Sequence, residues 1–264
     1  MQEDKVIIGT TANKKSAYAL EYFIRNQKAI QEIYPNSELV IASNDLDPID
    51  EEGLRCRVIK YPSRVFERFW NALFVLPHTD EQFIPQKIRI WDMVKGRNAA
   101  RDYFLKTNAG YFLSVDADMV YNPHLIPILM DEIKNYDVVM SAYMNRNHRP
   151  GYSLGCALIK RKVLEKVRFN CLIFHSFPDM PNIIEDGWMF EHDTIQWGFK
   201  INRGIFIKIN HLINDKEGIL ITPRKTTAWE KIKNNSTLRY FIVEFCILTK
   251  RDIPRIIVKK IGKL

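Results

Sequence analysis

The hydrophobic pattern of the first 60 residues alternates between short β-rich runs and one amphipathic helix. Residues 6–10 and 39–42 are apolar runs bounded by polar residues, and a third run at residues 57–61 ends before Pro62. Between the first two runs, apolar residues recur at helical spacing as far as Pro35, which predicts a helix that stops there. This alternation of strands and a helix is typical of a parallel α/β sheet.

The pattern from residue 63 to residue 106 is helical but contains residues that break helices. Pro77, Pro85 and Gly96 interrupt it, so the sequence predicts a final helix that begins at Arg97. A helix start exposes backbone N–H groups, and an arginine beside them can help to bind a phosphate. Arg97 is therefore a candidate phosphate ligand, and the ordinary alternative is an arginine at a helix end in water.

The clearest strand in the chain, at residues 111–115, is mostly apolar and should be central in the sheet. It ends in Asp116-Ala117-Asp118. Two carboxylates at the end of a buried strand are unfavourable unless a positive group holds them, and residues two apart on an extended segment point the same way. A divalent cation could be shared by the two acids, with Ala117 leaving space for a ligand. The alternative is an ordinary surface turn with two solvated acids.

The second half of the chain adds further candidates. The elements predicted there are a helix at 122–133, a strand at 137–142, an exposed loop at 145–153, a strand at 156–159, a helix at 161–166, a loop rich in Phe and Pro, a helix at 185–197 and a strand at 199–209. His211 follows the last strand and is a possible third ligand, because mixed oxygen and nitrogen ligation suits Mn²⁺ better than Ca²⁺. A lone histidine is more often structural. The helix that begins at Glu185 and Asp186 is rich in acids, although acids at a helix start commonly complement the helix dipole.

Several motifs occur in a fixed order along the chain. They are Val6-Ile7-Ile8-Gly9-Thr10, Arg97-Asn98-Ala99-Ala100-Arg101, the strand ending in Asp116-Ala117-Asp118, Gly155-Cys156-Ala157-Leu158-Ile159-Lys160-Arg161, Glu185-Asp186 with Gly198-Phe199-Lys200-Ile201, and Asn210-His211-Leu212. This ordered set resembles the GT-A glycosyltransferases, close to their family 2 type, over about residues 5–214. The resemblance implies an α/β fold with a Rossmann-like, mostly parallel central sheet flanked by helices. We therefore expect a catalytic domain at residues 1–221, with a nucleotide-sugar half up to about residue 120 and an acceptor half at 121–221. Residues 222–264 would form a basic helical C-terminal extension, for the reasons of charge given below.

The activity implied by the resemblance is metal-dependent transfer of a sugar from a nucleoside-diphosphate sugar to a hydroxyl of a glycan or lipid-linked acceptor. The enzyme would be of the hexosyltransferase type, with inversion expected and a UDP-sugar favoured over a GDP-sugar. Mn²⁺ or Mg²⁺ would stabilise the charge on the departing diphosphate. The resemblance assigns the metal to Asp116, Asp118 and His211. It assigns the donor to Thr10, Thr11, Asn44, Asp45, Arg97, Asp116, Ala117 and Asp118.

An inverting reaction needs one carboxylate to take the proton from the acceptor hydroxyl. Asp186 matches the family position best. Glu185, Glu191 and Asp193 are neighbouring candidates for the same role.

Positive charge is concentrated at the carboxyl end. From residue 222 to residue 264, eleven basic residues stand against three acidic ones, a net charge of +8, which leaves the first 221 residues neutral. A nucleic-acid-binding surface on the body of the protein is therefore not expected. After Ile253, isoleucines recur at helical spacing opposite lysines and an arginine. This pattern is typical of a helix that lies on an anionic membrane surface, or of one that docks its isoleucines on the protein.

A cytoplasmic location is expected, with peripheral attachment to the cytoplasmic membrane face as an option. The amino terminus is acidic and has no signal-peptide pattern, and the longest strongly apolar run, about nine residues, is well short of the roughly 20 that cross a bilayer. The four cysteines are widely spaced, as reduced thiols are.

Two other function classes fit parts of the sequence. A haloacid dehalogenase-type phosphatase also has Asp-x-Asp after an apolar strand, with the first acid as a nucleophile, but there the motif normally follows the first strand. A non-catalytic binding module would use its basic extension to hold an acidic partner.

Overall fold

The computed structural model describes residues 4–61, 83–144, 150–176, 180–207, 209–213, 216–219 and 236–249. The chain divides into two compact units. The first unit contains Met1–Tyr61, Gly96–Arg168 and Thr194–Lys225, and the second contains Pro62–Lys95, Phe169–Asp193 and Thr226–Leu264. Two of the five boundaries between them fall inside helices, one in α3 (Phe83–Lys106) and one in α6 (Asp186–Gln196).

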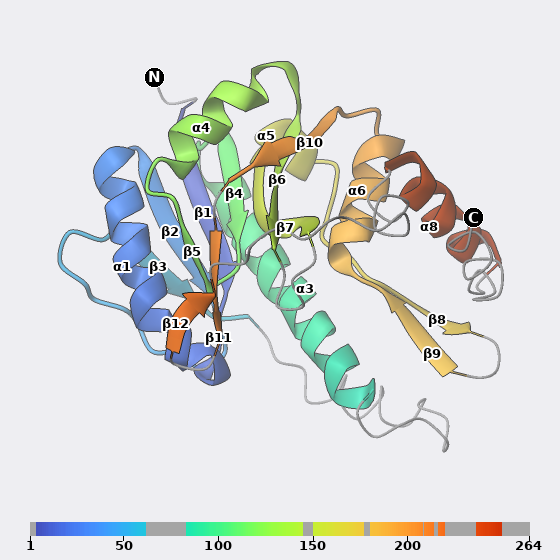
Figure 1. Ribbon diagram of the computed structural model, residues 1–264, viewed down its shortest axis with the longest axis horizontal. Helices are drawn as coiled ribbons and strands as arrows, with labels where there is room; N and C mark the ends of the chain where they lie inside the picture. Colours follow the sequence, from blue (N-terminus) through green and yellow to red (C-terminus); the bar gives the residue numbers. More distant parts are fainter. Residues whose placement is uncertain are drawn as a thin grey trace. The chain divides into compact units, whose positions relative to one another are not determined.

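The first unit is organised around a central sheet, seven-stranded in the described part of the chain (Figure 1). In spatial order it contains β10 (Ile201–Phe206), β6 (Val138–Met144), β7 (Pro150–Lys160), β4 (Tyr111–Val115), β1 (Val6–Thr11), β2 (Ser37–Ala42) and β3 (Cys56–Ile59). The pairs β4–β1, β1–β2, β2–β3 and β10–β6 are parallel, and β7 is antiparallel to both of its neighbours. The predicted mostly parallel α/β sheet is confirmed, although β7 begins within the segment predicted as an exposed loop.

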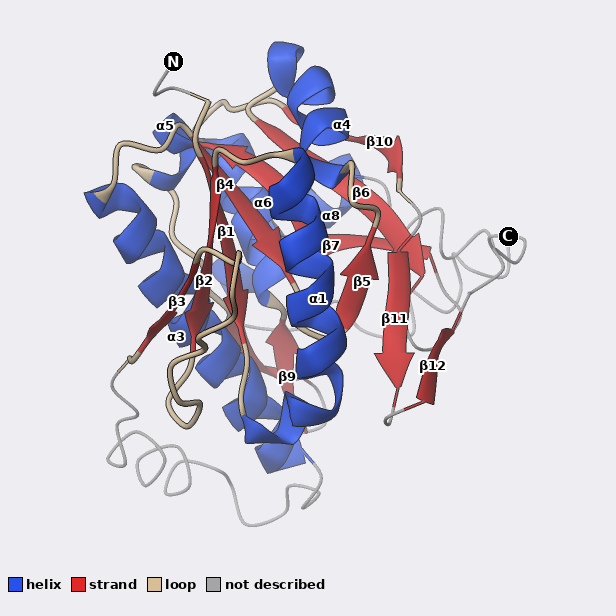
Figure 2. Cartoon of the chain, turned by 90° about the vertical axis from the view of Figure 1, so that its left-hand side faces the viewer, coloured by secondary structure: helices blue, strands red, loops and turns tan. Residues whose placement is uncertain are grey.

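Both faces of the sheet are covered by helices, as the apolar strands require. On one face, the core joins strand residues such as Ile8 and Leu113 to Phe23 of α1 (Ala17–Ile33) and Leu129 of α4 (Leu125–Glu132). Figure 2 shows α1 lying across this face. On the other face, the ring of Phe112 lies 5.5 Å from that of Phe104 in α3. Successive residues of β4 thus pack into two different layers.

Helix α3 contradicts the predicted helix breaks at Pro85 and Gly96, and the predicted break at Pro77 lies outside the described residues. The helix runs without interruption through Pro85 and Gly96. Pro85 is in the first turn, where the missing N–H has no intrahelical partner to lose. A Cβ at Gly96 would lie 2.4 Å from Cγ2 of Thr11, so this glycine permits a close approach to β1 and does not end the helix. The prediction that Arg97 stands at a helix start, beside free backbone amides, is therefore wrong.

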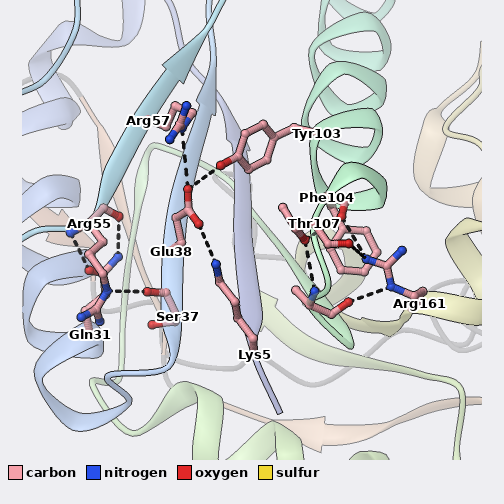
Figure 3. Close-up of polar contacts among 11 residues, drawn as sticks. Lys5, Gln31, Ser37, Glu38, Arg55, Arg57, Tyr103, Phe104, Thr107 and Arg161 are labelled. Carbon is pink, nitrogen blue, oxygen red and sulfur yellow. Dashed lines mark hydrogen bonds and ion pairs between the residues drawn. The ribbon is translucent and has the colours of Figure 1, made fainter. Parts of the chain in front are cut away.

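Arg161, the first residue of α5 (Arg161–Leu164), caps the carboxyl end of α3 with its side chain (Figure 3). Its guanidinium donates hydrogen bonds to the carbonyl oxygens of Thr107 at 2.6 Å, Ala109 at 2.8 Å and Phe104 at 3.1 Å. The last carbonyls of a helix have no intrahelical partners and carry partial negative charge, so a cation is favourable there. This basic residue of the motif set therefore contributes to the fold.

A second polar cluster lies at the amino end of β2 (Figure 3). Glu38 accepts hydrogen bonds from Tyr103 of α3 at 2.6 Å and from Lys5 at 3.0 Å, and Arg57 lies 3.8 Å away. Burial alone would raise the pKa of Glu38, but these two hydrogen bonds and the two positive charges hold it below its usual value.

A small antiparallel sheet in the first unit was not predicted. It consists of β5 (Met119–Tyr121), β11 (Ile209–Ile213) and β12 (Lys216–Ile219), in the order β12-β11-β5. The strand predicted at 199–209 is in fact two strands, β10 and β11. His211 consequently lies within a strand, where it pairs with Met119.

The second unit contains the hairpin of β8 (Leu172–Ser176) and β9 (Met180–Ile184), where the sequence indicated a loop. It also contains the start of α6, predicted correctly, and α8 (Ser236–Thr249), which lies in the basic extension. Residues 250–264, with the predicted amphipathic pattern, lie outside the described residues. Within the described part of the chain, no helix is long and apolar enough to cross a membrane.

Candidate functional site

The predicted donor-binding residues of the first unit follow adjacent parallel strands. Thr10 and Thr11 end β1, Asn44 and Asp45 follow β2, and Asp116 follows β4. These strands pair in parallel, with Thr11 opposite Ala42 and Gly9 opposite Ser114. Their carboxyl ends therefore meet at one edge of the sheet, which is where open α/β sheets bind ligands.

Residues after β1 and β2 differ in what they can offer a ligand. The hydroxyl of Thr10 is buried and has no hydrogen-bond partner among the described residues. Asp45 is exposed, and its carboxylate accepts hydrogen bonds from the backbone N–H of Lys14 at 3.2 Å and from the Ser43 hydroxyl at 3.1 Å. Asn44 is also exposed, with its side-chain oxygen 3.4 Å from the N–H of Tyr61. The hydrogen bonds of Asp45 thus link the segment after β1 to the end of β2.

Asp116 forms an ion pair with Arg97. Nη2 of Arg97 lies 2.7 Å from Oδ1 of Asp116, and the two side chains are 5% and 27% exposed. Arg97 lies in the interior of α3, whereas the sequence predicted it at a helix start. This buried guanidinium supplies the positive charge that a carboxylate needs at the end of a buried strand.

Three buried titratable groups near Asp116 remain protonated. Burial, and then the charge of Asp116, raise the pKa of the Cys156 thiol to about 12. The same two causes raise the pKa values of the Tyr121 and Tyr143 hydroxyls well above their usual range. These neighbours are therefore neutral at physiological pH, and the negative charge of Asp116 is opposed by Arg97.

Gly155 of β7 leaves room for the Asp116 carboxylate. A Cβ at this position would lie 2.5 Å from Oδ2 of Asp116 and 2.7 Å from Oη of Tyr143. Both distances are shorter than van der Waals contact. Because Val115 pairs with Cys156 in an antiparallel ladder, Gly155 lies beside Asp116. A side chain at residue 155 would therefore displace the carboxylate.

Asp118 lies beside His211. Oδ2 of Asp118 is 3.4 Å from Nε2 of His211, and the side chains are 18% and 10% exposed. Two atoms that bind one divalent cation at about 2.1 Å and at a right angle are about 3 Å apart, so this pair has nearly the spacing of neighbouring metal ligands. Across the described residues, no group of three His, Cys, Asp or Glu side chains has the arrangement of a metal site. The structure brings together two of the three predicted ligands, and the third, Asp116, contacts Arg97.

The acids of α6 lie in the second unit and differ in their surroundings. Asp186 is the first helical residue and is 3% exposed, and its Oδ1 accepts a hydrogen bond from the N–H of Gly187 at 3.0 Å. Glu185 is exposed, and its carbonyl accepts the N–H groups of Trp188 and Met189 at the helix start.

Glu191 and Asp193 are engaged in contacts that involve α8. Glu191 is 2% exposed and lies 3.4 Å from Nη1 of Arg239 in α8, whose guanidinium also stacks on the ring of Trp188. Asp193 lies 2.9 Å from Nδ1 of His192, and Nε2 of His192 lies 2.7 Å from Glu244 of α8. These two acids have structural contacts that the sequence did not indicate, because residues 239 and 244 are about 50 positions away.

The chain was compared with known proteins. No protein-family model and no curated protein sequence matches it. The mannosyltransferase PcManGT from Pyrobaculum calidifontis, solved in complex with GDP-Man and Mn²⁺, is similar over 92% of this chain and 64% of its own, with 10% identity and a TM-score of 0.51. The chain has the GT-A fold.

Two other structures are similar at lower TM-scores. A TarS fragment (1–349) from S. aureus in complex with UDP-GlcNAc matches 91% of this chain and 72% of its own, with 10% identity and a TM-score of 0.46. The galactosyltransferase LgtC, in complex with donor and acceptor sugar analogs, matches 60% of this chain and 58% of its own, with 14% identity and a TM-score of 0.35. Of these three, PcManGT alone reaches a TM-score that supports a common fold, and this chain spans 64% of its length.

The GT-A fold bears on the phosphatase alternative. The acidic turn follows β4, the fourth strand among the described residues, and Asp116 is paired with Arg97 at 2.7 Å. In the phosphatase pattern the nucleophilic acid follows the first strand. The position of the acidic turn therefore argues against the phosphatase alternative.

Substitution of Gly155 by alanine tests the close approach to Asp116. Because the new Cβ would contact the Asp116 carboxylate and the Tyr143 hydroxyl, we expect the free energy of unfolding to fall by about 1–3 kcal/mol. In an Asp116→Ala background the same substitution should have an effect smaller by at least about 0.5 kcal/mol, since one of the two clashes is absent. Urea unfolding of the four proteins measures both quantities. Gly204→Ala is the matched control, because its nearest neighbour is the Asn202 side chain at 3.2 Å. Equal effects of Gly155→Ala in both backgrounds would contradict the contact.

Proposed function

We propose that the protein is a glycosyltransferase that moves a sugar from a nucleoside-diphosphate sugar to an acceptor hydroxyl with the help of a divalent cation. The observation that supports this most directly is the Asp118–His211 pair, 3.4 Å apart at the carboxyl edge of a GT-A sheet. Mn²⁺ or Mg²⁺ bound there would stabilise negative charge on the departing nucleoside diphosphate without a proton transfer. The mixed oxygen and nitrogen donors of the pair suit Mn²⁺.

The roles of the neighbouring residues follow from their contacts. Arg97 holds Asp116 in place through the ion pair, and its charge makes the edge less repulsive to a diphosphate. Thr10 lies at the end of β1, where the resemblance places the nucleoside, and its hydroxyl is buried. Thr11, Asn44, Asp45 and Ala117 complete the proposed donor-binding set.

A screen of nucleotide sugars with and without Mn²⁺ tests the donor and the metal together. A ligand at 100 times its Kd adds about 2.7 kcal/mol to the stability, so the correct donor should raise the melting temperature by roughly 5 °C or more. We expect the increase to require Mn²⁺ and to be absent in Asp118→Asn and His211→Ala. UDP-sugars and GDP-sugars should both be included, because the resemblance favours UDP whereas PcManGT was solved with GDP-Man.

Asp131→Asn is the control for this screen, because Asp131 is an exposed residue of α4 that pairs with Lys134. A donor response that is equal with and without Mn²⁺ would contradict the metal site. Donor binding without sugar transfer to any acceptor would favour a non-catalytic binding module.

Asp186 is the proposed base that takes the proton from the acceptor hydroxyl in an inverting reaction. Glu191 lies beside Arg239, and Asp193 lies beside His192. Asp186 is the first residue of α6, at the position where the resemblance to the GT-A glycosyltransferases expects the base. Glu185 is exposed at the helix start and is the weaker candidate.

Replacement of Asp186 by asparagine tests this role. Asparagine preserves the size of the side chain and the hydrogen bond to Gly187, so we expect a folded protein that binds the donor with unchanged affinity. Loss of a general base typically lowers kcat by about 10²–10⁴-fold. Initial rates and donor titrations on Asp186→Asn, with Asp131→Asn as the control, separate kcat from binding. If Asp186→Asn keeps its kcat while Glu191→Gln or Asp193→Asn loses it, the assignment is wrong.

The basic extension is proposed to attach the protein to an anionic membrane surface, where a lipid-linked acceptor would be available. The helix α8 packs on α6 through Arg239, Val243 and Glu244, so this part of the extension belongs to the folded second unit. The following residues, 250–264, contain six basic residues and one acidic residue. Each basic residue near an anionic surface contributes about 1 kcal/mol.

Removal of residues 250–264 tests the membrane proposal without disturbing α8. We expect the truncated protein to bind vesicles that contain phosphatidylserine at least about tenfold more weakly than the full chain, because six positive charges are lost. Cosedimentation measures the binding, and vesicles of phosphatidylcholine alone are the control. Equal binding of both proteins to the anionic vesicles would contradict the proposal.

A further inference from the structure

We propose that Tyr121, held by Asn26, is a positioning residue that fixes the acidic turn and the Asp118–His211 pair. The proposal rests on the proposed function only in its consequence for metal and donor binding. Tyr121 is the last residue of β5, five residues after Asp116, and 2% of its surface is exposed. Three sets of contacts, from α1, β4–β7 and β11, meet at this residue.

The backbone of Tyr121 is held by the side chain of one helical residue. Nδ2 of Asn26 in α1 donates a hydrogen bond to the carbonyl oxygen of Tyr121, and the N–H of Tyr121 donates to Oδ1 of Asn26, both at 2.8 Å. One amide side chain thus satisfies both backbone groups, in the way that a residue of a neighbouring strand would. Asn26 is 8% exposed, so the two bonds are shielded from competing water.

The hydroxyl of Tyr121 lies where β4 separates from β7. The next ladder bond after the Val115–Cys156 pair would join the N–H of Asp116 to the carbonyl of Gly155, and there the distance has lengthened to 3.3 Å. The N–H of Asp116 donates to Oη of Tyr121 at 2.9 Å, and Oη donates to the carbonyl of Gly155 at 2.6 Å. The hydroxyl therefore bridges the opening ladder and satisfies both backbone groups at the point where the turn begins.

The position of β5 determines the position of His211. Tyr121 pairs with Ile209 and Met119 pairs with His211, and the N–H of Leu212 donates to the carbonyl of Asp118 at 2.8 Å. A shift of β5 along or away from β11 would change the 3.4 Å separation of Asp118 and His211. The same shift would move Asp116 relative to Arg97, because Tyr121 is hydrogen-bonded to the backbone of Asp116.

The chemistry of Tyr121 is that of a fixed hydrogen-bonding group. Burial, and then the charge of Asp116, raise the pKa of its hydroxyl well above the usual value, so it stays neutral. The hydrogen-bond contacts of its hydroxyl are all to backbone groups, namely the N–H of Asp116 and the carbonyl oxygens of Gly155 and, at 3.1 Å, of Asp116. It therefore acts through Asp116 and Asp118 and not on the substrate itself.

Hydrogen exchange in the metal-free protein tests the positioning role directly. Tyr121→Phe keeps the ring and removes the bridging oxygen. We expect exchange of backbone amides to accelerate at least about tenfold in residues 116–121 and 209–213, since the N–H of Asp116 loses the shorter of its two acceptors and the bridge to β7 is removed. Exchange in β1 and β2 should be unchanged. Asn26→Asp, which retains one of the two bonds to Tyr121, should give the same regional pattern with a smaller increase.

Tyr103→Phe is the matched control. It removes a hydroxyl that also makes a short hydrogen bond, to Glu38 at 2.6 Å, but at the amino end of β2. We expect this variant to leave exchange in residues 116–121 and 209–213 unchanged. Unchanged exchange in those segments of Tyr121→Phe and Asn26→Asp would overturn the proposal, and so would a uniform increase along the whole chain.

A titration with Mn²⁺ in the presence of UDP or GDP tests the consequence for the site. Groups that orient metal ligands commonly contribute 10- to 100-fold to metal affinity, so Tyr121→Phe should bind Mn²⁺ at least about tenfold more weakly. Tyr103→Phe should stay within about twofold of the natural protein. If the natural protein binds no Mn²⁺ with either nucleotide, the proposed metal site fails, and the exchange experiment still decides whether Tyr121 positions the turn. If Mn²⁺ binds equally to the natural protein and to Tyr121→Phe, the positioning proposal fails and the metal site stands.

Discussion

The ion pair between Arg97 and Asp116 is the contact on which the candidate site depends. A strand buried on both faces ends in a carboxylate, and a carboxylate in such a place requires a compensating charge. Arg97, in the interior of α3, supplies this charge, with its Nη2 2.7 Å from Oδ1 of Asp116. Glycines make the arrangement possible from both sides, because Gly96 lets α3 approach β1 and Gly155 lets the carboxylate approach β7. The metal-free protein can therefore keep Asp116 in place without a cation at the turn.

Local patterns in the sequence were sufficient for much of the fold. The apolar run of β4, the helical spacing of α1 and the acidic start of α6 are signals contained within single elements, and each of these elements formed as predicted. The prediction of a break in α3 was wrong because the effect of Pro85 and Gly96 depends on their surroundings. Proline does not interrupt a helix when it lies in the first turn. Gly96 lies inside the helix because a larger residue there would clash with the Thr11 side chain of β1. The hairpin β8–β9 was missed because its Phe and Pro content resembles that of a loop.

The location of the site could be predicted from the sequence, but the contacts between its side chains could not. The carboxyl edge of the sheet follows from the strand order, and the acids and threonines at the ends of β1, β2 and β4 lie on it. Which side chains touch depends on contacts between distant segments. Asp118 meets His211 because β5 and β11 pair in one register, and Asp116 meets Arg97 because α3 continues past Gly96. Asn26 and Tyr121, 95 positions apart, have no motif that would have indicated their hydrogen bonds.

The contacts of α8 change how the charge of the carboxyl-terminal extension is interpreted. Arg239 is 6% exposed and lies beside the buried Glu191, and Glu244 contacts His192. The charges of this helix are therefore largely matched within the second unit, as buried charges must be. Outside α8, the extension has six basic residues and one acidic residue at 250–264, and four basic residues and one acidic residue at 222–235. The same contacts give Glu191 and Asp193 a structural role in the packing of α6 and α8. They also show that α8 belongs to the folded second unit, so a membrane contact is proposed for the residues that follow it.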